Sequence, residues 1–281
     1  MKERIIVSLT TWSKRIGNIP VVLETIFNQT RQPDFVVLNL AYDEIIPENV
    51  QHYIDSHNIE INRVVDTKVY KKLIPTLKKY PNDCVISIDD DWLYPKEMIA
   101  DFVSIHEQYP YFPVSGNNIG LFGLQCHCGC ASLTKAEYMG KYLNLFDQDV
   151  IDCCPSDDIV YTFFCNKAGH PYIRTKGLYF RNLVPYNDED SYSDNYGGHM
   201  RISNSFQYLS NRFGKIDNPF SAYIKDEYIA QQIKDIFDYC LQHQSKIVQQ
   251  ETTLKIQNSY SYRIGNSLIK PITFLKRILR H

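Results

Sequence analysis

The chain has 281 residues, of which 44% are hydrophobic and 22% are charged, and its formal net charge at pH 7 is −2. This composition is typical of a folded protein with one large domain and appendages, or at most two small domains. The nearly neutral charge argues against nucleic acid as a partner, and the absence of any run of eighteen apolar residues argues against a transmembrane helix.

The first apolar segment, residues 4–9, gives way to polar residues at Thr10. It is too short for the core of a signal peptide, and no small-residue cleavage site follows it. We therefore interpret it as a first buried strand and expect a cytoplasmic protein.

Strand and helix patterns alternate over the first hundred residues. Apolar, β-branched runs predict strands at 35–40, 59–65 and 84–88, and apolar residues at helical spacing predict helices at 19–28, 47–56, 73–79 and 95–107. Such alternation predicts an α/β fold with a mostly parallel sheet flanked by helices. Ligands of these sheets bind outside the carboxyl ends of the strands, which here are the segments 10–16, 41–43 and 89–92.

The second half of the chain is less regular. Residues 114–132 read as loops with short strands, 134–143 as a helix capped by Thr134, and 159–167 as a helix that follows Ser156-Asp157-Asp158. Short strands are predicted at 171–173 and 178–180, and the acidic segment 186–198 is predicted to be a mobile lid. We expect one domain at 1–220, with a nucleotide-binding half at about 1–110 and an acceptor half at about 111–220, and a helical extension at 221–281.

The eight cysteines include one dense cluster, Cys126, Cys128 and Cys130. Zinc sites usually pair cysteines at C-x₂₋₄-C spacing on two separate segments, and this C-x-C-x-C pattern fits that rule poorly. Free thiols are therefore the favoured interpretation, and the role of the cluster stays open.

The strongest chemical signal is the triplet Asp89-Asp90-Asp91, directly after the predicted strand 84–88. Three adjacent carboxylates repel one another unless a cation lies nearby. Asp89 and Asp91 can turn the same way at the end of a strand, and such oxygen ligands suit Mg²⁺ or Mn²⁺. The alternative is a surface turn whose acids complement a helix N-terminus.

Several segments together resemble bacterial family 2-like glycosyltransferases of the GT-A fold and Asp-x-Asp type. They are residues 5–16 (IIVSLTTWSKRI), 26–30 (IFNQT), 33–38 (PDFVVL), 70–73 (YKKL), 79–81 (KYP), 89–95 (DDDWLYP), 156–159 (SDDI) and 167–171 (KAGHP). The resemblance covers roughly residues 4–180. It implies transfer of a sugar from a nucleotide-diphosphate sugar, with UDP favoured, to a hydroxyl of a glycan or lipid-linked acceptor in cell-surface polysaccharide synthesis.

The resemblance also implies roles for residues around the donor. Asp91 would be the main ligand of a divalent metal, with Asp89 on the metal or the ribose and Asp90 beside it. Lys71 or Lys72 would face the diphosphate, although a solvated helix face explains these lysines equally well. The remaining donor contacts would come from Thr10, Thr11, Trp12, Arg15 and Asp43. Asp43 lies in Ala41-Tyr42-Asp43-Glu44, which departs from the family's usual Asp-Asp-Gly-Ser, so the nucleotide base stays open.

An inverting transferase needs a carboxylate to take the proton of the attacking hydroxyl. The resemblance points to the second acid of the pair Asp157-Asp158, so we expect Asp158 to be the base. The alternative is a helix start in which Ser156 caps and both acids complement the dipole. His199, after Gly197-Gly198, is a candidate further metal ligand, although an isolated loop histidine usually has no such role.

The last segment, 269–280, is predicted to be a basic amphipathic helix, and no acidic residue follows Glu251. Such a helix can lie on an anionic membrane surface, which would place the protein peripherally on the inner membrane. Packing against its own domain is the alternative. Three other functions stay open: a retaining glycosyltransferase, a nucleotidyltransferase, which would usually show a glycine-rich loop after the first strand, and a non-catalytic sugar- or partner-binding module.

Overall fold

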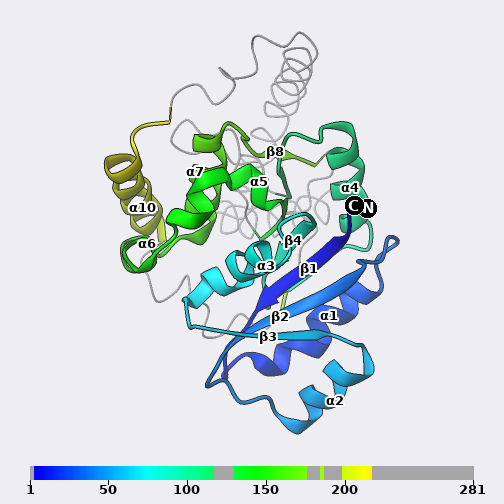
Figure 1. The fold of residues 1–281 in the computed structure, drawn as a ribbon. Coiled ribbons are helices and arrows are strands. Elements are labelled where there is room, and N and C mark those ends of the chain that lie inside the picture. Colours follow the sequence, from blue (N-terminus) through cyan, green and yellow to red (C-terminus); the bar gives the residue numbers. More distant parts are fainter. Residues whose placement is uncertain (1–2, 117–129, 176–183, 187–197, 217–281) are drawn as a thin grey trace, which may run out of the picture. The chain divides into compact units, whose positions relative to one another are not determined.

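The computed structural model describes residues 3–116, 130–175, 184–186 and 198–216, which all belong to one compact unit, Met1–Lys225 (Figure 1). Within this part of the chain, no helix is both long enough and apolar enough to cross a bilayer. The predicted strand at 178–180, most of the predicted lid at 186–198, the helical extension at 221–281 and the basic segment at 269–280 lie outside the described residues.

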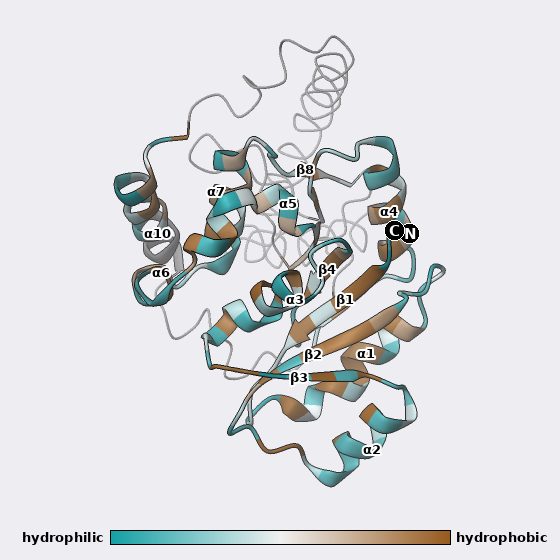
Figure 2. Ribbon diagram, in the orientation of Figure 1, coloured by the Kyte–Doolittle hydropathy of each residue, from teal (hydrophilic) through white to brown (hydrophobic). Residues whose placement is uncertain are grey.

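A seven-stranded sheet forms the centre of the unit and confirms the predicted α/β class. Its first four neighbours are all parallel, in the order β3 (Glu60–Val64), β2 (Phe35–Ala41), β1 (Ile5–Thr10) and β4 (Cys84–Ile88). The sheet continues through β7 (Ala131–Thr134), antiparallel to β4, then β6 (Val114–Ser115) and β8 (Ile173–Arg174). The hydrophobic colouring of β1 and β2 in Figure 2 matches strands that are buried on both faces.

Helices cover both faces of the sheet. Side-chain contacts assign one face to α1 (Ile19–Phe27) and α4 (Met98–Gln108), since Cys84 of β4 contacts His106 of α4 and Gln29, just past α1, bonds to α4. The next residue of β4, Val85, joins the core on the opposite face. That core is built by η2 (Lys68–Lys72), α3 (Ile74–Lys79), α5 (Ala136–Met139), η3 (Gly140–Leu145), α6 (Gln148–Cys153), α7 (Asp157–Ala168) and α10 (Gly198–Phe213).

Two predicted helix starts differ from the structure for identifiable reasons. The helix predicted at 95–107 begins at Met98, where the side chain of Gln29 accepts a hydrogen bond from the N–H of Ile99 (3.0 Å) and donates one to the carbonyl of Pro95 (2.8 Å). The predicted cap Thr134 is wrong: it is the last residue of β7, its hydroxyl hydrogen-bonds to Tyr172, and α5 starts after Lys135. Long-range pairing, which local pattern does not contain, decides both positions.

The helix that carries the second acidic pair forms as the sequence predicts. α7 spans Asp157–Ala168 and ends at Gly169, whose φ of 93° is the left-handed conformation that glycine adopts without strain. Ser156 is its N-cap residue, but the serine side chain makes no capping hydrogen bond. The first acids of α7 are therefore left to complement the helix dipole and to meet other partners.

Candidate active site

The acidic triplet lies at the carboxyl end of β4, in the middle of the sheet and beside the carboxyl end of β1. Directly after it, β5 (Trp92–Leu93) pairs with β9 (Val184–Pro185). Tyr94, whose role the sequence did not reveal, fixes the loop: its hydroxyl accepts a hydrogen bond from the N–H of Asp89 (2.8 Å) and lies within bonding distance of the carbonyls of Asp89 (3.2 Å) and Cys130 (3.1 Å). Tyr94 therefore fixes the backbone of Asp89, the first acid of the triplet.

Arg15 joins the segment after β1 to two acids of the triplet. Its Nη2 lies 2.5 Å from Asp90 Oδ1 and 2.8 Å from Asp91 Oδ2, and the hydroxyl of Thr11 donates to Asp90 Oδ2 at 2.6 Å. Burial by itself would lower the pKa of Arg15, but the two carboxylates raise it overall. Asp90 is buried with both oxygens bonded, so it organises the loop together with Thr11 and Arg15.

Lys72 connects the triplet to the acidic pair of α7. Its ammonium lies 2.7 Å from Asp89 Oδ1 and 2.8 Å from Asp157 Oδ2, and its side chain is only 7% exposed. Burial opposes the positive charge, but Asp157 and Asp89 raise the pKa of Lys72 well above its ordinary value. Two motifs that lie 68 residues apart in the sequence (Asp89 and Asp157) thus meet at one buried cation.

The two acids at the start of α7 have different environments. Asp157 is buried against Lys72, and Asp158 is partly exposed. The charge of Asp158 still acts on both Asp89 and Lys72, which raises the pKa values of these groups. Asp158 is therefore the acid of the pair that a bound molecule can reach.

The site carries an excess of negative charge. Asp89, Asp90, Asp91, Asp157 and Asp158 face two cations, Lys72 and Arg15, so three formal negative charges remain uncompensated by these ion pairs. Burial and the neighbouring carboxylates raise the pKa of Asp89, with Lys72 opposing them. A cation bound from solution would relieve this repulsion.

Asp91 has the atom best placed to accept such a cation. Its Oδ2 contacts Arg15, but its buried Oδ1 has no hydrogen-bond partner among the described residues. The site acids do not bring three ligand atoms together within the described residues, so they form no closed ligand shell by themselves. The unpaired oxygen and the excess negative charge would suit a divalent ion, which would have to take further ligands from a bound molecule or water.

A buried network of polar side chains contacts the backbone of Lys72. The hydroxyl of Ser8 donates to the carbonyl of Lys72 (2.6 Å) and lies 2.7 Å from the hydroxyl of Thr76. The amide of Asn39 donates to both hydroxyls (3.0 and 2.9 Å) and accepts from Asn62 (2.7 Å). This network was not predicted from the sequence, in which its signal is two polar residues, Ser8 and Asn39, inside otherwise apolar strands.

The other residues predicted to contact the nucleotide-sugar donor follow the same strands but bind other partners in the structure. Thr10 donates to the carbonyl of Asn39 (2.8 Å), and Lys71 pairs with Asp66 rather than with the acidic triplet. Trp12 follows β1; it is 38% exposed, and the centre of its ring lies 5.1 Å from the ammonium of Lys14. Asp43 follows β2 and is exposed. Their contacts with a donor remain predictions.

Three sequence candidates can be described only in part. His199 lies in the first turn of α10, but its side chain is outside the described residues. Cys126 and Cys128 are also outside them. Cys130 is a free thiol, and burial raises its pKa well above the ordinary value.

Comparisons with known proteins identify no family for this chain. No protein-family profile matches it, and no curated protein sequence matches it significantly. A structure of S. aureus TarS 1-349 in complex with UDP superposes with a TM-score of 0.47 at 13% identity, covering 75% of this chain and 70% of that chain. A 4-diphosphocytidyl-2C-methyl-D-erythritol synthase structure gives 0.42 at 11% identity, covering 69% and 97%.

A third structure is glucosyl-3-phosphoglycerate synthase from Mycobacterium tuberculosis with Mn2+, UDP and glucosyl-3-phosphoglycerate. It gives a TM-score of 0.38 at 12% identity, and the match covers 49% of this chain and 58% of that chain. Likeness at this level does not identify a function, so the functional argument rests on the residues of the site.

Proposed function

We propose that this protein is a GT-A-type glycosyltransferase that moves a sugar from a nucleotide-diphosphate sugar, with UDP favoured, to a hydroxyl of a glycan or lipid-linked acceptor. The observation that carries the proposal is Lys72, which joins the triplet after β4 to the acidic pair of α7 at the carboxyl edge of the sheet. Ligands of open α/β sheets bind at this edge. The position of Asp89, Asp91 and Asp158 near this edge supports the roles that the sequence resemblance implies for them.

A divalent ion, Mn²⁺ or Mg²⁺, would be held by Asp91 and Asp89, with His199 as a further candidate ligand. The unpaired Oδ1 of Asp91 and the excess of negative charge support this assignment. When bound, such an ion supplies Lewis-acid stabilisation of the charge that develops on a diphosphate leaving group. Arg15 and Lys72 would keep the acids oriented toward it.

Asp158 would act as general base in an inverting transfer. Asp157 is neutralised by Lys72, whereas Asp158 is partly exposed, so Asp158 is better able to take the proton of an acceptor hydroxyl. Asp157 would then be a positioning residue that fixes the start of α7 through Lys72.

The proposal extends to the rest of the chain as follows. Residues 1–220 would form the transferase domain, and the extension at 221–281 would end in a segment, 269–280, that lies on the inner membrane surface. A membrane position would suit a lipid-linked acceptor made in the cytoplasm.

Calorimetric titration of UDP into the purified protein, with and without Mn²⁺, tests the donor site. We expect Mn²⁺-dependent binding in the wild type and its loss in Asp91→Asn, because this change removes the charge but keeps the shape of the proposed ligand. Asp55→Asn is the matched control, since Asp55 is exposed on α2 (Glu48–Ser56) and its carboxylate accepts a hydrogen bond from Gln51 of the same helix. It should bind UDP like the wild type.

The possible outcomes separate the alternatives. Binding of UDP with turnover of a UDP-sugar that Asp158→Asn abolishes would support an inverting transferase, and turnover that survives this change would favour a retaining one. Absence of binding to UDP, GDP and CDP alike would refute the nucleotide-sugar donor.

A further inference from the structure

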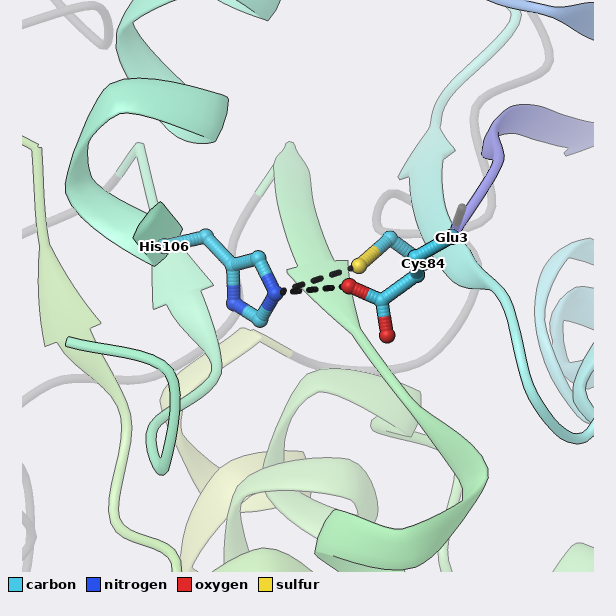
Figure 3. Close-up of side chains that lie close together, drawn as sticks. All are labelled: Glu3, Cys84 and His106. Carbon is cyan, nitrogen blue, oxygen red and sulfur yellow. Dashed lines mark hydrogen bonds and ion pairs between the residues drawn. The ribbon is translucent and has the colours of Figure 1, made fainter. Parts of the chain in front are cut away.

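A second cluster of possible metal ligands lies at the opposite, amino edge of the sheet. Glu3 precedes β1, Cys84 is the first residue of β4, and His106 belongs to the last turn of α4 (Figure 3). Each offers one ligand atom, and the three atoms lie within 4.8 Å of one another. In the part of the chain that the structure describes, this is the one group of three or more such residues.

The distances in this cluster match the spacing of ligands around a tetrahedral zinc ion. Nε2 of His106 lies 3.3 Å from Sγ of Cys84 and 3.2 Å from Oε2 of Glu3. With ordinary zinc bond lengths, the edges of a tetrahedron measure about 3.5 Å between sulfur and nitrogen and about 3.3 Å between nitrogen and oxygen. The three side chains converge on one point in Figure 3.

Tyr138 contacts the ring nitrogen of His106 that does not face this point. Its hydroxyl donates to the carbonyl of Pro110 (2.6 Å) and lies 3.4 Å from Nδ1 of His106. Nε2 is thus the ring nitrogen that faces Glu3 and Cys84.

The surroundings of the three ligands also suit a metal. Lys135 binds the other oxygen of Glu3 (2.6 Å) and leaves Oε2 directed at His106, while Tyr138 orients the ring, as outer partners of metal ligands do. Zinc bound at these three atoms would release the thiol proton of Cys84, because the thiolate is the form that binds a metal.

We propose that Glu3, Cys84 and His106 form a zinc-class metal site, distinct from the acidic site at the other edge of the sheet. The ligand set of sulfur, nitrogen and oxygen selects zinc rather than Mg²⁺ or Mn²⁺. The site joins the segment before β1, the start of β4 and the end of α4. It leaves a fourth position for water or another ligand, and Glu3, 33% exposed, gives access from solvent. This proposal is independent of the proposed transferase activity.

Titration of the metal-free full-length protein with Co²⁺ tests the site, because a cobalt–thiolate bond gives a charge-transfer absorption band that carboxylate ligands do not give. We expect a band at one equivalent, bleached by Zn²⁺, and a rise in melting temperature with Zn²⁺. Glu3→Gln, at the partly exposed ligand, should keep the fold and weaken Co²⁺ binding at least tenfold. Cys84→Ala should abolish the band.

Cys153→Ser is the matched control, because Cys153 is an exposed free thiol away from the cluster. It should leave the band unchanged. A wild-type protein without the band would show that hydrogen bonds alone, rather than a metal, join the three side chains. A band that persists in Cys84→Ala and disappears when Cys126 and Cys128 are changed to serine would place the thiolate elsewhere; either result overturns the proposal.

Discussion

At the scale of single residues, Lys72 has the largest expected effect on both stability and function. Its ammonium is shared between Asp89 and Asp157. Lys72 and Asp157 are buried, whereas the side chain of Asp89 is 28% exposed. Lys72→Met would leave two carboxylates without their cation, and removal of one partner from a buried ion pair costs about 3–5 kcal/mol. We expect urea denaturation to show a loss of this size, together with loss of the metal-dependent UDP binding proposed above.

Two further variants show whether the cost of Lys72→Met comes from its ion pairs or from the loss of any lysine in this region. Lys71→Met removes the neighbouring ammonium, whose partner Asp66 is largely exposed, and should cost well under half as much. In an Asp157→Asn background, Lys72→Met should cost less than in the wild type, because one of the stranded charges is gone. Equal costs in both backgrounds would contradict the proposed coupling.

At the scale of secondary structure, the hydrogen bonds around Asn39 join η2 and α3 to strands β1 and β2. Asn39 donates to Ser8 and Thr76 and accepts from Asn62. Asn39→Leu would remove these three hydrogen bonds, while Ser8 and Thr76 keep each other as partners. We expect a loss of about 2–4 kcal/mol in the free energy of unfolding. Asn62→Ala, at the partly buried end of the network, should cost about 1 kcal/mol. Similar losses in both variants would show that burial of Asn39, rather than its bonds, sets the cost.

The sequence predicts the parallel half of the sheet well because each strand there is a continuous apolar run. The predicted strand 84–88 matches β4 residue for residue, and the helix at 19–28 differs from α1 by one residue. The sequence patterns do not predict α6 or the antiparallel place of β7 between β4 and β6. Strand order depends on contacts that no local pattern encodes.

The sequence indicated which acidic residues belong to the candidate site, but not which ion pairs join them. The acidic triplet and the pair at 157–158 were recognised as chemical groups, because adjacent carboxylates after a strand and before a helix are unusual locally. That Lys72 joins them, and that Arg15 binds Asp90 and Asp91, follows only from the fold. The Glu3, Cys84 and His106 cluster has no signal in the sequence, since its members are 81 and 22 residues apart.

At the scale of the whole molecule, the two edges of the sheet carry different chemistry. The carboxyl edge holds hard oxygen ligands with excess negative charge, and the amino edge holds a sulfur, nitrogen and oxygen set. A hard ion and zinc would therefore bind at separate places, so removing one should not empty the other. The acidic edge would also repel an anionic lipid surface, and any attraction to such a surface has to come from elsewhere in the chain.

The basic segment 269–280 is the proposed source of that attraction. It contains Lys270, Lys276, Arg277 and Arg280 and no acidic residue. Each basic residue near an anionic surface contributes about 1 kcal/mol, so changing Lys276, Arg277 and Arg280 together to glutamine should weaken binding roughly a hundredfold. Co-sedimentation with phosphatidylserine-containing vesicles measures this loss. The control variant changes Lys78, Lys79 and Lys96 to glutamine. It has the same net charge as the first triple variant and should bind the vesicles like the wild type. Equal loss in both triple variants would show that overall charge, not this segment, attracts the protein to lipid.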